Sequence, residues 1–154
     1  MLIKKIVMNN FRQFKENETI EFSTSSKNNV TIIMGENGAG KTTLAQAFLW
    51  VLYGETDFKD KKVVNKKVIE EAKNGENIFT RVDLYIEENN IEYQISRYQR
   101  YIKKSNKVDY TNTQLEIRYK DENGVTKNIE AIDCKDFINN ILPNELSRFF
   151  FFDG

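Results

Sequence analysis

Hydrophobic and polar positions alternate along much of the chain, in a pattern that predicts several β-strands. β-Branched and aliphatic residues predict a first strand over 1–9, and a short alternating stretch predicts a second over 19–22. Period-two alternation marks three later segments, and asparagine and glycine, which accept positive φ, lie in the expected turns between and after them. The pattern therefore predicts an antiparallel meander, with strands around Val82 to Ile86, Ile91 to Ile95 and Leu115 to Tyr119, and turns at Asn89-Asn90 and Glu122-Asn123-Gly124.

Other segments have the pattern of buried helices and of a buried strand. Residues 41–53 are good helix formers and are apolar on nearly every side, and Gly54 follows where a C-cap glycine belongs. A second helix is predicted over 133–142, capped by Asp133 and ended by Pro143. The five-residue apolar run 30–34 is typical of a fully buried strand. The charged stretch 55–77 is expected at the surface, with a short helix around 68–73.

A phosphate-binding motif lies between this strand and the first helix. The sequence Gly-Glu-Asn-Gly-Ala-Gly-Lys-Thr over 35–42 matches G-x-x-x-x-G-K-[ST], and the strand before it and the helix after it are the context of a working P-loop. Its backbone N–H groups and the helix N-terminus would cradle phosphates, Lys41 would reach the β- and γ-phosphates, and Thr42 would bind Mg²⁺. Thr43 would add its amide or hydroxyl near the α-phosphate. No guanine-specificity pattern is present, which favours ATP.

Composition limits the remaining chemistry. The 154 residues make about one domain, and 40% hydrophobic with 30% charged residues is typical of a folded protein. The formal net charge is zero, so any contact with DNA needs a local patch. The sequence has no histidine, which excludes imidazole catalysis and imidazole metal ligands. Cys134 is the single cysteine, so internal disulfides are excluded, and the longest apolar run, 47–53, is too short for a membrane helix. These features favour a cytoplasmic protein.

Motifs around the P-loop resemble the ABC-type ATPase heads of the SMC, RecF and RecN group. Asn-Phe-Arg-Gln-Phe over 10–14 resembles the group's N-F-R-x-F element, and the loop interior over 36–39 matches its G-x-N-G-x-G-K form. The resemblance implies an α/β P-loop NTPase with a mixed β-sheet, an antiparallel meander and a buried helix after the P-loop. It also implies that 1–154 is the N-terminal lobe of a head, separated by a coiled coil from a C-terminal lobe that carries the Walker B strand, the signature motif and the switch histidine.

The resemblance assigns roles to individual positions. Arg12 would lie near the nucleotide, Asn37 near the γ-phosphate, and Lys41 would be catalytic. The implied cofactors are ATP and Mg²⁺, and hydrolysis would need the second lobe and a second head, so the isolated chain should bind weakly and not turn over. The expected nucleotide-binding residues are Arg12, Gly35, Glu36, Asn37, Gly38, Ala39, Gly40, Lys41, Thr42 and Thr43.

The last thirteen residues narrow the resemblance. Leu-Pro-Asn-Glu-Leu-Ser-Arg-Phe-Phe-Phe-Phe-Asp-Gly over 142–154 is similar to a segment of the DndD family, ATPases of DNA sulfur modification, and of related defence-system ATPases. Asp153 stands where the wider group has the Q-loop glutamine, so the resemblance makes it a catalytic residue and a Mg²⁺ ligand; a simple turn with Gly154 is the alternative. The phenylalanines over 149–152 are expected to form an interior strand.

One basic segment offers a nucleic-acid contact. Residues 97–107 contain five basic residues, no acid and two tyrosines, which could neutralise phosphates and stack on bases, although a solvated strand end is the plainer interpretation. Expected partners are a second head, the missing lobe, DNA and other proteins of a modification or defence system, with no membrane. A DNA-repair ATPase and a nucleotide-binding regulatory module without hydrolysis are the alternatives.

Overall fold

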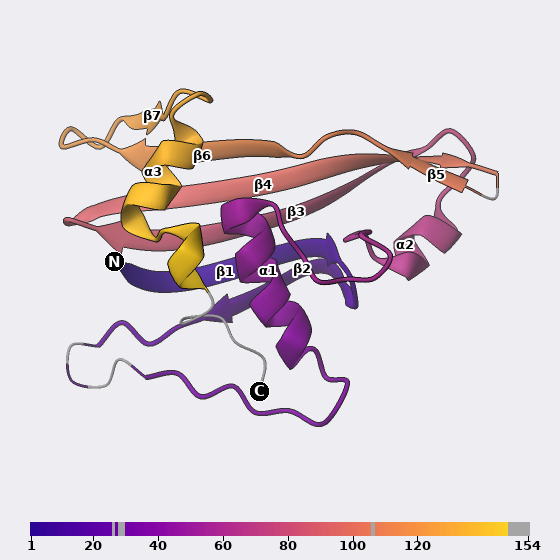
Figure 1. Ribbon diagram of the computed structural model, residues 1–154, viewed down its shortest axis with the longest axis horizontal. Coiled ribbons are helices and arrows are strands. Elements are labelled where there is room, and N and C mark those ends of the chain that lie inside the picture. The colour runs from indigo at the N-terminus through magenta and orange to yellow at the C-terminus, as the bar shows by residue number, and fades with distance from the viewer. Residues whose placement is uncertain (26, 28–29, 106, 148–154) are drawn as a thin grey trace.

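The computed structural model describes residues 1–25, 27, 30–105 and 107–147 (Figure 1). The predictions for the phenylalanines over 149–152 and for Asp153 lie outside the described residues. The elements in chain order are β1 (Leu2–Phe11), β2 (Phe14–Glu21), α1 (Lys41–Tyr53), α2 (Lys66–Glu71), β3 (Asn77–Glu88), β4 (Ile91–Lys104), β5 (Lys107–Tyr110), β6 (Gln114–Lys120), β7 (Thr126–Asn128), α3 (Cys134–Ile141) and the 3₁₀ turn η1 (Asn144–Leu146).

The predicted meander is confirmed as part of a larger sheet. The described strands form one seven-stranded sheet in the order β2-β1-β3-β4-β6-β7, with β5 paired to the far end of β4, and each of these pairings is antiparallel. Across four strands, Leu84 lies opposite Ile6 and Ile95, and Ile95 lies opposite Ile117. All four side chains are buried, so this row of residues forms the side of the hydrophobic core that the sheet contributes.

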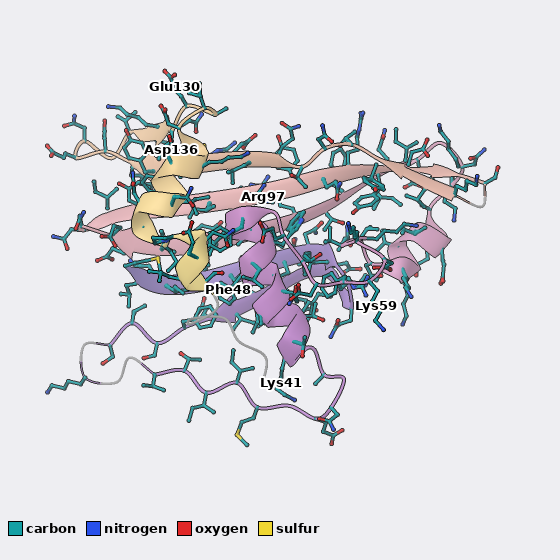
Figure 2. The ribbon with its side chains drawn as sticks, viewed as in Figure 1. Lys41, Phe48, Lys59, Arg97, Glu130 and Asp136 are labelled. Carbon is teal, nitrogen blue, oxygen red and sulfur yellow. The ribbon has the colours of Figure 1, made fainter. Side chains whose placement is uncertain are left out.

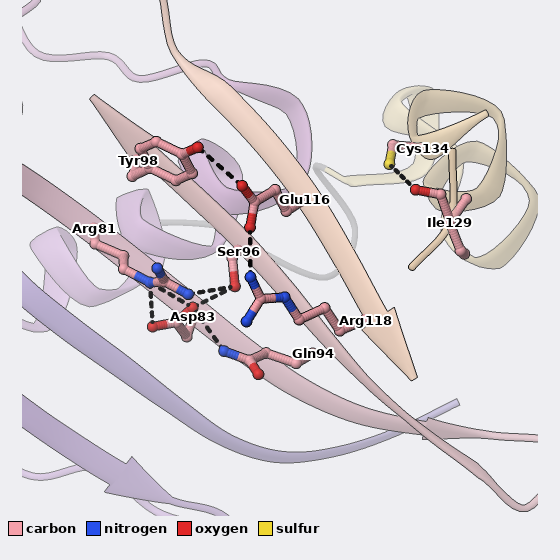
Figure 3. Close-up of polar contacts among 9 residues, drawn as sticks. All are labelled: Arg81, Asp83, Gln94, Ser96, Tyr98, Glu116, Arg118, Ile129 and Cys134. Carbon is pink, nitrogen blue, oxygen red and sulfur yellow. Dashed lines mark hydrogen bonds and ion pairs between the residues drawn. The ribbon is translucent and has the colours of Figure 1, made fainter. Parts of the chain in front are cut away.

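Helices cover only one face of the sheet. Figure 1 shows α1 and α3 lying in front of the strands, on the face that carries the buried row. On the opposite face, polar side chains from β3, β4 and β6 bond to one another (Figure 3). Asp83 accepts hydrogen bonds from Arg81 Nε at 2.9 Å, from Gln94 Nε2 at 3.1 Å and from the Ser96 hydroxyl. This part of the open face is therefore a network of hydrogen-bonded polar side chains, which suits contact with water.

The C-terminal end of α1 is fixed to the sheet by a buried arginine. The N–H of Gly54, at φ +76°, donates to the Trp50 carbonyl at 2.8 Å, which confirms the predicted C-cap. Arg97, 6% exposed, donates through Nε to the Val51 carbonyl and through Nη2 to the Leu52 carbonyl, each at 3.1 Å. Burial lowers the pKa of Arg97 to about 10. A cation thus binds the negative end of the helix that follows the P-loop.

The basic segment 97–107 is consequently divided between two faces of β4. Arg97 and Tyr101 are buried against α1 and the core, whereas Arg100 is exposed on the other face. Strand alternation separates residues that are neighbours in sequence. The segment as a whole is therefore not a continuous nucleic-acid face.

The predicted buried strand at 30–34 is wrong for the described residues. Ile32 is 79% and Met34 88% exposed, and none of the strands that the structure describes pairs with this segment. Figure 1 shows it as an extended trace outside the sheet. An apolar run of this length becomes a buried strand only where neighbouring strands flank it, and the seven described strands are paired elsewhere.

The stretch 55–77 is less superficial than expected. Part of it is buried, at Val63, Val64 and Asn65. Two backbone hydrogen bonds hold it against the end of β1: the Arg12 N–H donates to the Val63 carbonyl at 2.7 Å, and the Asn65 N–H donates to the Asn10 carbonyl at 2.8 Å. The Asn65 side chain caps α2 by accepting from two backbone N–H groups, so this helix begins and ends two residues earlier than predicted. Within the described residues, no helix combines the length and the apolar character that crossing a bilayer would require.

A candidate phosphate-binding loop

The glycine-rich loop has the backbone that the motif requires. Gly38 has φ +85° and Gly40 φ +110°, a region that other residues rarely adopt. The Leu44 N–H donates to the Gly40 carbonyl at 2.8 Å, which closes the first turn of α1. Helix geometry leaves the N–H groups of that first turn without an acceptor inside the helix, at the positive end of its dipole. The loop and the helix start therefore offer backbone donors that suit an anion, which makes them the candidate phosphate site.

Lys41 completes the loop with a positive charge. Its ammonium donates to the Gly35 carbonyl at 2.5 Å and to the Glu36 carbonyl at 3.0 Å. Figure 2 shows Lys41 at the N-terminal end of α1, beside the loop. Carbonyl oxygens carry only a partial negative charge, so a phosphate is a stronger acceptor for this ammonium than the groups that hold it.

Small residues bring other groups close to the loop backbone. A methyl group on Gly40 would lie 2.7 Å from Gln13 Nε2 and 2.9 Å from Phe14 Cζ, and one on Gly35 would lie 3.1 Å from the Ala39 side chain. These distances are shorter than van der Waals contact, so glycine is required at 40 for close approach as well as for φ.

Gln13 and Phe14 are contacts that the sequence reasoning missed. The turn between β1 and β2 places both against the loop, and the Thr43 hydroxyl donates to Gln13 Oε1 at 2.6 Å. The signal was present in the N-F-R-Q-F element, but alternation alone does not say which loop that turn touches.

Arg12 lies next to Gln13 and is already paired. Its Nη1 donates to Asp60 Oδ1 at 2.9 Å and to the Lys62 carbonyl at 2.8 Å, and its guanidinium lies 4.2 Å from the centre of the Phe58 ring. Partial burial raises the pKa of Asp60, but the Lys62 N–H and the Arg12 charge outweigh this and lower it overall. The expected contact of Arg12 with nucleotide remains a prediction.

A cavity of about 460 Å³ adjoins the turn. It is lined by Gln13, Val64 and Asn65 and by four basic side chains, those of Arg12, Lys15, Lys66 and Lys67. Through Gln13 it borders the start of α1. An anionic or polar ligand held at the P-loop therefore has a basic cavity beside it.

The structure brings most of the predicted site residues together in one loop and one helical turn. The donor set suits a Mg²⁺-bound triphosphate, because it combines backbone N–H groups, one ammonium and a hydroxyl oxygen of the kind that Mg²⁺ accepts. Asp153, the second predicted Mg²⁺ ligand, lies outside the described residues. The residues gathered here are Gly35, Glu36, Asn37, Gly38, Ala39, Gly40, Lys41, Thr42 and Thr43.

Known proteins resemble this chain in part of its sequence and in its fold. Residues 5–153 match the family described as AAA domain (AAA_23). Over 58 residues the chain is 40% identical to the SbcC component of the nuclease SbcCD of Staphylococcus saprophyticus, a match that covers 38% of this chain and 6% of the relative. Over 60 residues it is 37% identical to the chromosome partition protein Smc of Fusobacterium nucleatum, covering 39% of this chain and 5% of the relative. The matches thus span about a twentieth of each relative's length.

A solved structure extends the comparison over the whole fold. It comes from work on ATP-driven dimerization and DNA stimulated activation of SMC ATPases, and it superposes with a TM-score of 0.52. The superposition covers 99% of this chain and 93% of the solved chain at 17% sequence identity. This likeness shows the fold, and it confirms the fold class that the sequence predicted.

Proposed function

Because the chain belongs to the AAA_23 family of AAA domains and has the fold of an SMC ATPase head, we propose that it is the nucleotide-binding lobe of an SMC-like ATPase that acts on DNA. One observation carries the proposal: the ammonium of Lys41 is held by the loop carbonyls of Gly35 and Glu36, directly beside the N-terminus of α1. This placement of an ammonium beside a helix N-terminus supports the proposed binding of a triphosphate.

Each group of the loop has a distinct part in binding. The backbone N–H groups over 35–43 hold the α- and β-phosphates, and Lys41 exchanges its carbonyl acceptors for oxygens of the β- and γ-phosphates. Asn37 lies in the loop interior, from which it is proposed to reach the γ-phosphate. The Thr42 hydroxyl is a ligand for Mg²⁺, which when bound neutralises charge on the phosphates. Asp153 is proposed as a second oxygen ligand and Arg12 as a nucleotide contact.

The exposed segment before the loop supports the idea of a second lobe. Val30, Ile32 and Met34 are between 74% and 88% exposed, although they belong to an apolar run directly before the P-loop. Exposed apolar runs of this kind mark interaction sites. We propose that a C-terminal lobe supplies strands that pair with this segment and position the P-loop, and that hydrolysis requires this lobe and a second head.

A lysine-rich end of the molecule offers a contact for DNA. Residues 59–67 contain five lysines, and β5 brings Lys107 beside them. A cavity of about 440 Å³ is lined by four basic side chains, those of Arg12, Lys62, Lys66 and Lys107, and by two carboxylates, Asp60 and Asp109, so basic groups are in excess. Two segments about forty residues apart thus form one basic patch. Such patches bind the phosphate backbone without reading sequence. We place the DNA contact here, in preference to the whole of 97–107.

The cellular process in which the ATPase takes part is a more specific proposal. The resemblance of 142–154 to DndD-type ATPases favours DNA sulfur modification or phage defence in the cytoplasm. The likeness to the SbcC component of a nuclease favours DNA repair as the second candidate. A regulatory module that binds nucleotide without hydrolysing it is the alternative from another class.

Reconstitution with a second lobe tests the proposal. The gene is expected to continue into a heptad-bearing segment and a Walker B strand, and a stop codon after Gly154 would favour the regulatory module. The chain alone should not hydrolyse Mg-ATP, and joining the two lobes should produce hydrolysis. Ile32→Ser should weaken association of the lobes, whereas Ile132→Ser, at an equally exposed isoleucine between β7 and α3, should not. If the two-lobe protein binds ATP but does not hydrolyse it, the proposed ATPase activity would be contradicted.

A further inference from the structure

The side chain of Gln13 lies between the β1–β2 turn and the first turn of α1. Its Oε1 accepts the hydroxyl proton of Thr43 at 2.6 Å, and Thr43 is only 8% exposed. Its Nε2 lies 2.7 Å from the point where a Cβ on Gly40 would stand. One amide therefore contacts both the last glycine of the P-loop and the third residue of the helix that follows it.

The hydroxyl of Thr43 has only one proton to donate. A phosphate oxygen is an acceptor, so it could use this hydroxyl only by taking the proton from Gln13. The backbone N–H of Thr43 belongs to the first turn of α1 and has no acceptor inside the helix. Thr43 could therefore contact a phosphate in two ways. A contact through the hydroxyl would break its bond to Gln13, whereas a contact through the backbone N–H would keep that bond.

The turn that carries Gln13 is anchored on both sides. On its far side, the Arg12 N–H donates to the Val63 carbonyl at 2.7 Å, and the Asn65 N–H donates to the Asn10 carbonyl at 2.8 Å. On its near side, the Phe14 ring packs against Gly40. The Thr43 end of this hydrogen bond is buried whereas Gln13 is exposed, and a part-buried hydrogen bond between two anchored segments still costs free energy to break without replacement.

We propose that Gln13 is a positioning residue for nucleotide. It keeps the Thr43 hydroxyl as a strut that fixes the start of α1, and Thr43 meets the phosphates through its backbone N–H alone. The inference rests on the proposed nucleotide binding and assigns a function to the variable position of the N-F-R-x-F element. Of the two groups of Thr43 that could meet the phosphate, the amide therefore does so and the hydroxyl does not.

A double-mutant cycle on nucleotide affinity tests this role. Mg-ATP is titrated into the ¹⁵N-labelled 154-residue chain, and the dissociation constant is taken from amide shifts, which also report weak binding. Gln13→Met and Thr43→Val each remove one side of the bond, and each should weaken binding about threefold to tenfold. The double variant should be no weaker than either single variant, because both changes break the same bond. Thr43→Ser, which keeps the hydroxyl, should bind within about twofold of the wild type.

Gln46→Met is the matched control. Gln46 lies on the same helix as Thr43, is 6% exposed against 8% for Thr43, and bonds through its amide to Asp57. Its loss should lower the melting temperature and leave the dissociation constant unchanged. The positioning role of Gln13 would be overturned if the fold-losses in affinity of Gln13→Met and Thr43→Val multiplied in the double variant, or if Gln13→Met bound as the wild type does. Neither result would contradict the proposed nucleotide binding. A wild-type chain that shows no shifts with Mg-ATP would instead overturn the proposed nucleotide binding.

Discussion

The ammonium nitrogen of Lys41 lies 2.5 Å from the carbonyl oxygen of Gly35, six residues earlier in the chain. The loop therefore folds back on its own lysine, which donates to the carbonyls of Gly35 and Glu36. The same arrangement depends on glycine at a few positions, which allows sharp tests.

Gly40→Ala should destabilise the chain and impair nucleotide binding. The new methyl group would overlap Gln13 and Phe14, and alanine is strained at φ +110°. The two effects together should lower the free energy of unfolding by about 2–4 kcal/mol, measured by urea denaturation.

Gly124→Ala separates the two causes. Gly124 also has positive φ, but the space around its Cβ position is open, so only the backbone strain applies. Its cost should be about 1 kcal/mol. Equal losses in the two variants would show that the contact of Gly40 with Gln13 and Phe14 contributes nothing.

Arg97→Lys should destabilise the chain although the charge is kept. An ammonium cannot span the Val51 and Leu52 carbonyls as the planar guanidinium does, so one buried carbonyl loses its donor. The expected loss is about 1–2 kcal/mol in the free energy of unfolding. Arg100→Lys, on the exposed face of the same strand, should change it by less than about 0.5 kcal/mol. A loss at Arg100 as large as that at Arg97 would argue against the helix anchor.

Removing Lys66 and Lys107 together should weaken DNA binding in a salt-dependent way. If each contacts one phosphate of duplex DNA, the Lys66→Ala, Lys107→Ala variant should reduce the slope of log affinity against log salt by about 2. Fluorescence anisotropy of a labelled duplex measures this slope.

Lys120 and Lys135 provide the control pair. They lie on β6 and α3, at the other end of the sheet from α2 and β5 (Figure 1). Alanine at both should leave the slope unchanged. The same decrease in both pairs would indicate diffuse attraction rather than a localised patch.

The elements that sequence predicted well are those whose partners are local or repeat the same pattern. α1 was predicted from Lys41 to Tyr53 because its capping glycine and helix formers are adjacent, and the strands around Leu84, Ile95 and Ile117 because alternation reports burial of one face. The segment 30–34 has the composition of a buried strand but no described strand beside it, so composition alone misplaced it.

Long-range pairings account for most of what the sequence did not reveal about the site. The motif located Lys41 and the loop glycines, since their spacing follows from phosphate binding. It did not reveal that Gln13 accepts a hydrogen bond from Thr43, or that Arg12 pairs with Asp60. It also did not reveal that Arg97, within the basic segment, binds the carbonyls at the end of α1. Each of these contacts joins residues at least thirty positions apart, and neither alternation nor local propensity carries that information.

The most direct test of the central claim is the affinity of the Lys41→Ala chain for Mg-ATP, measured by the same amide-shift titration as the wild type. Loss of the ammonium should abolish detectable binding, because the β- and γ-phosphates lose their only proposed side-chain cation in the loop. Lys59→Ala, a lysine outside the loop, should bind as the wild type does. Unchanged affinity in Lys41→Ala would contradict the assignment of 35–42 as a triphosphate-binding loop.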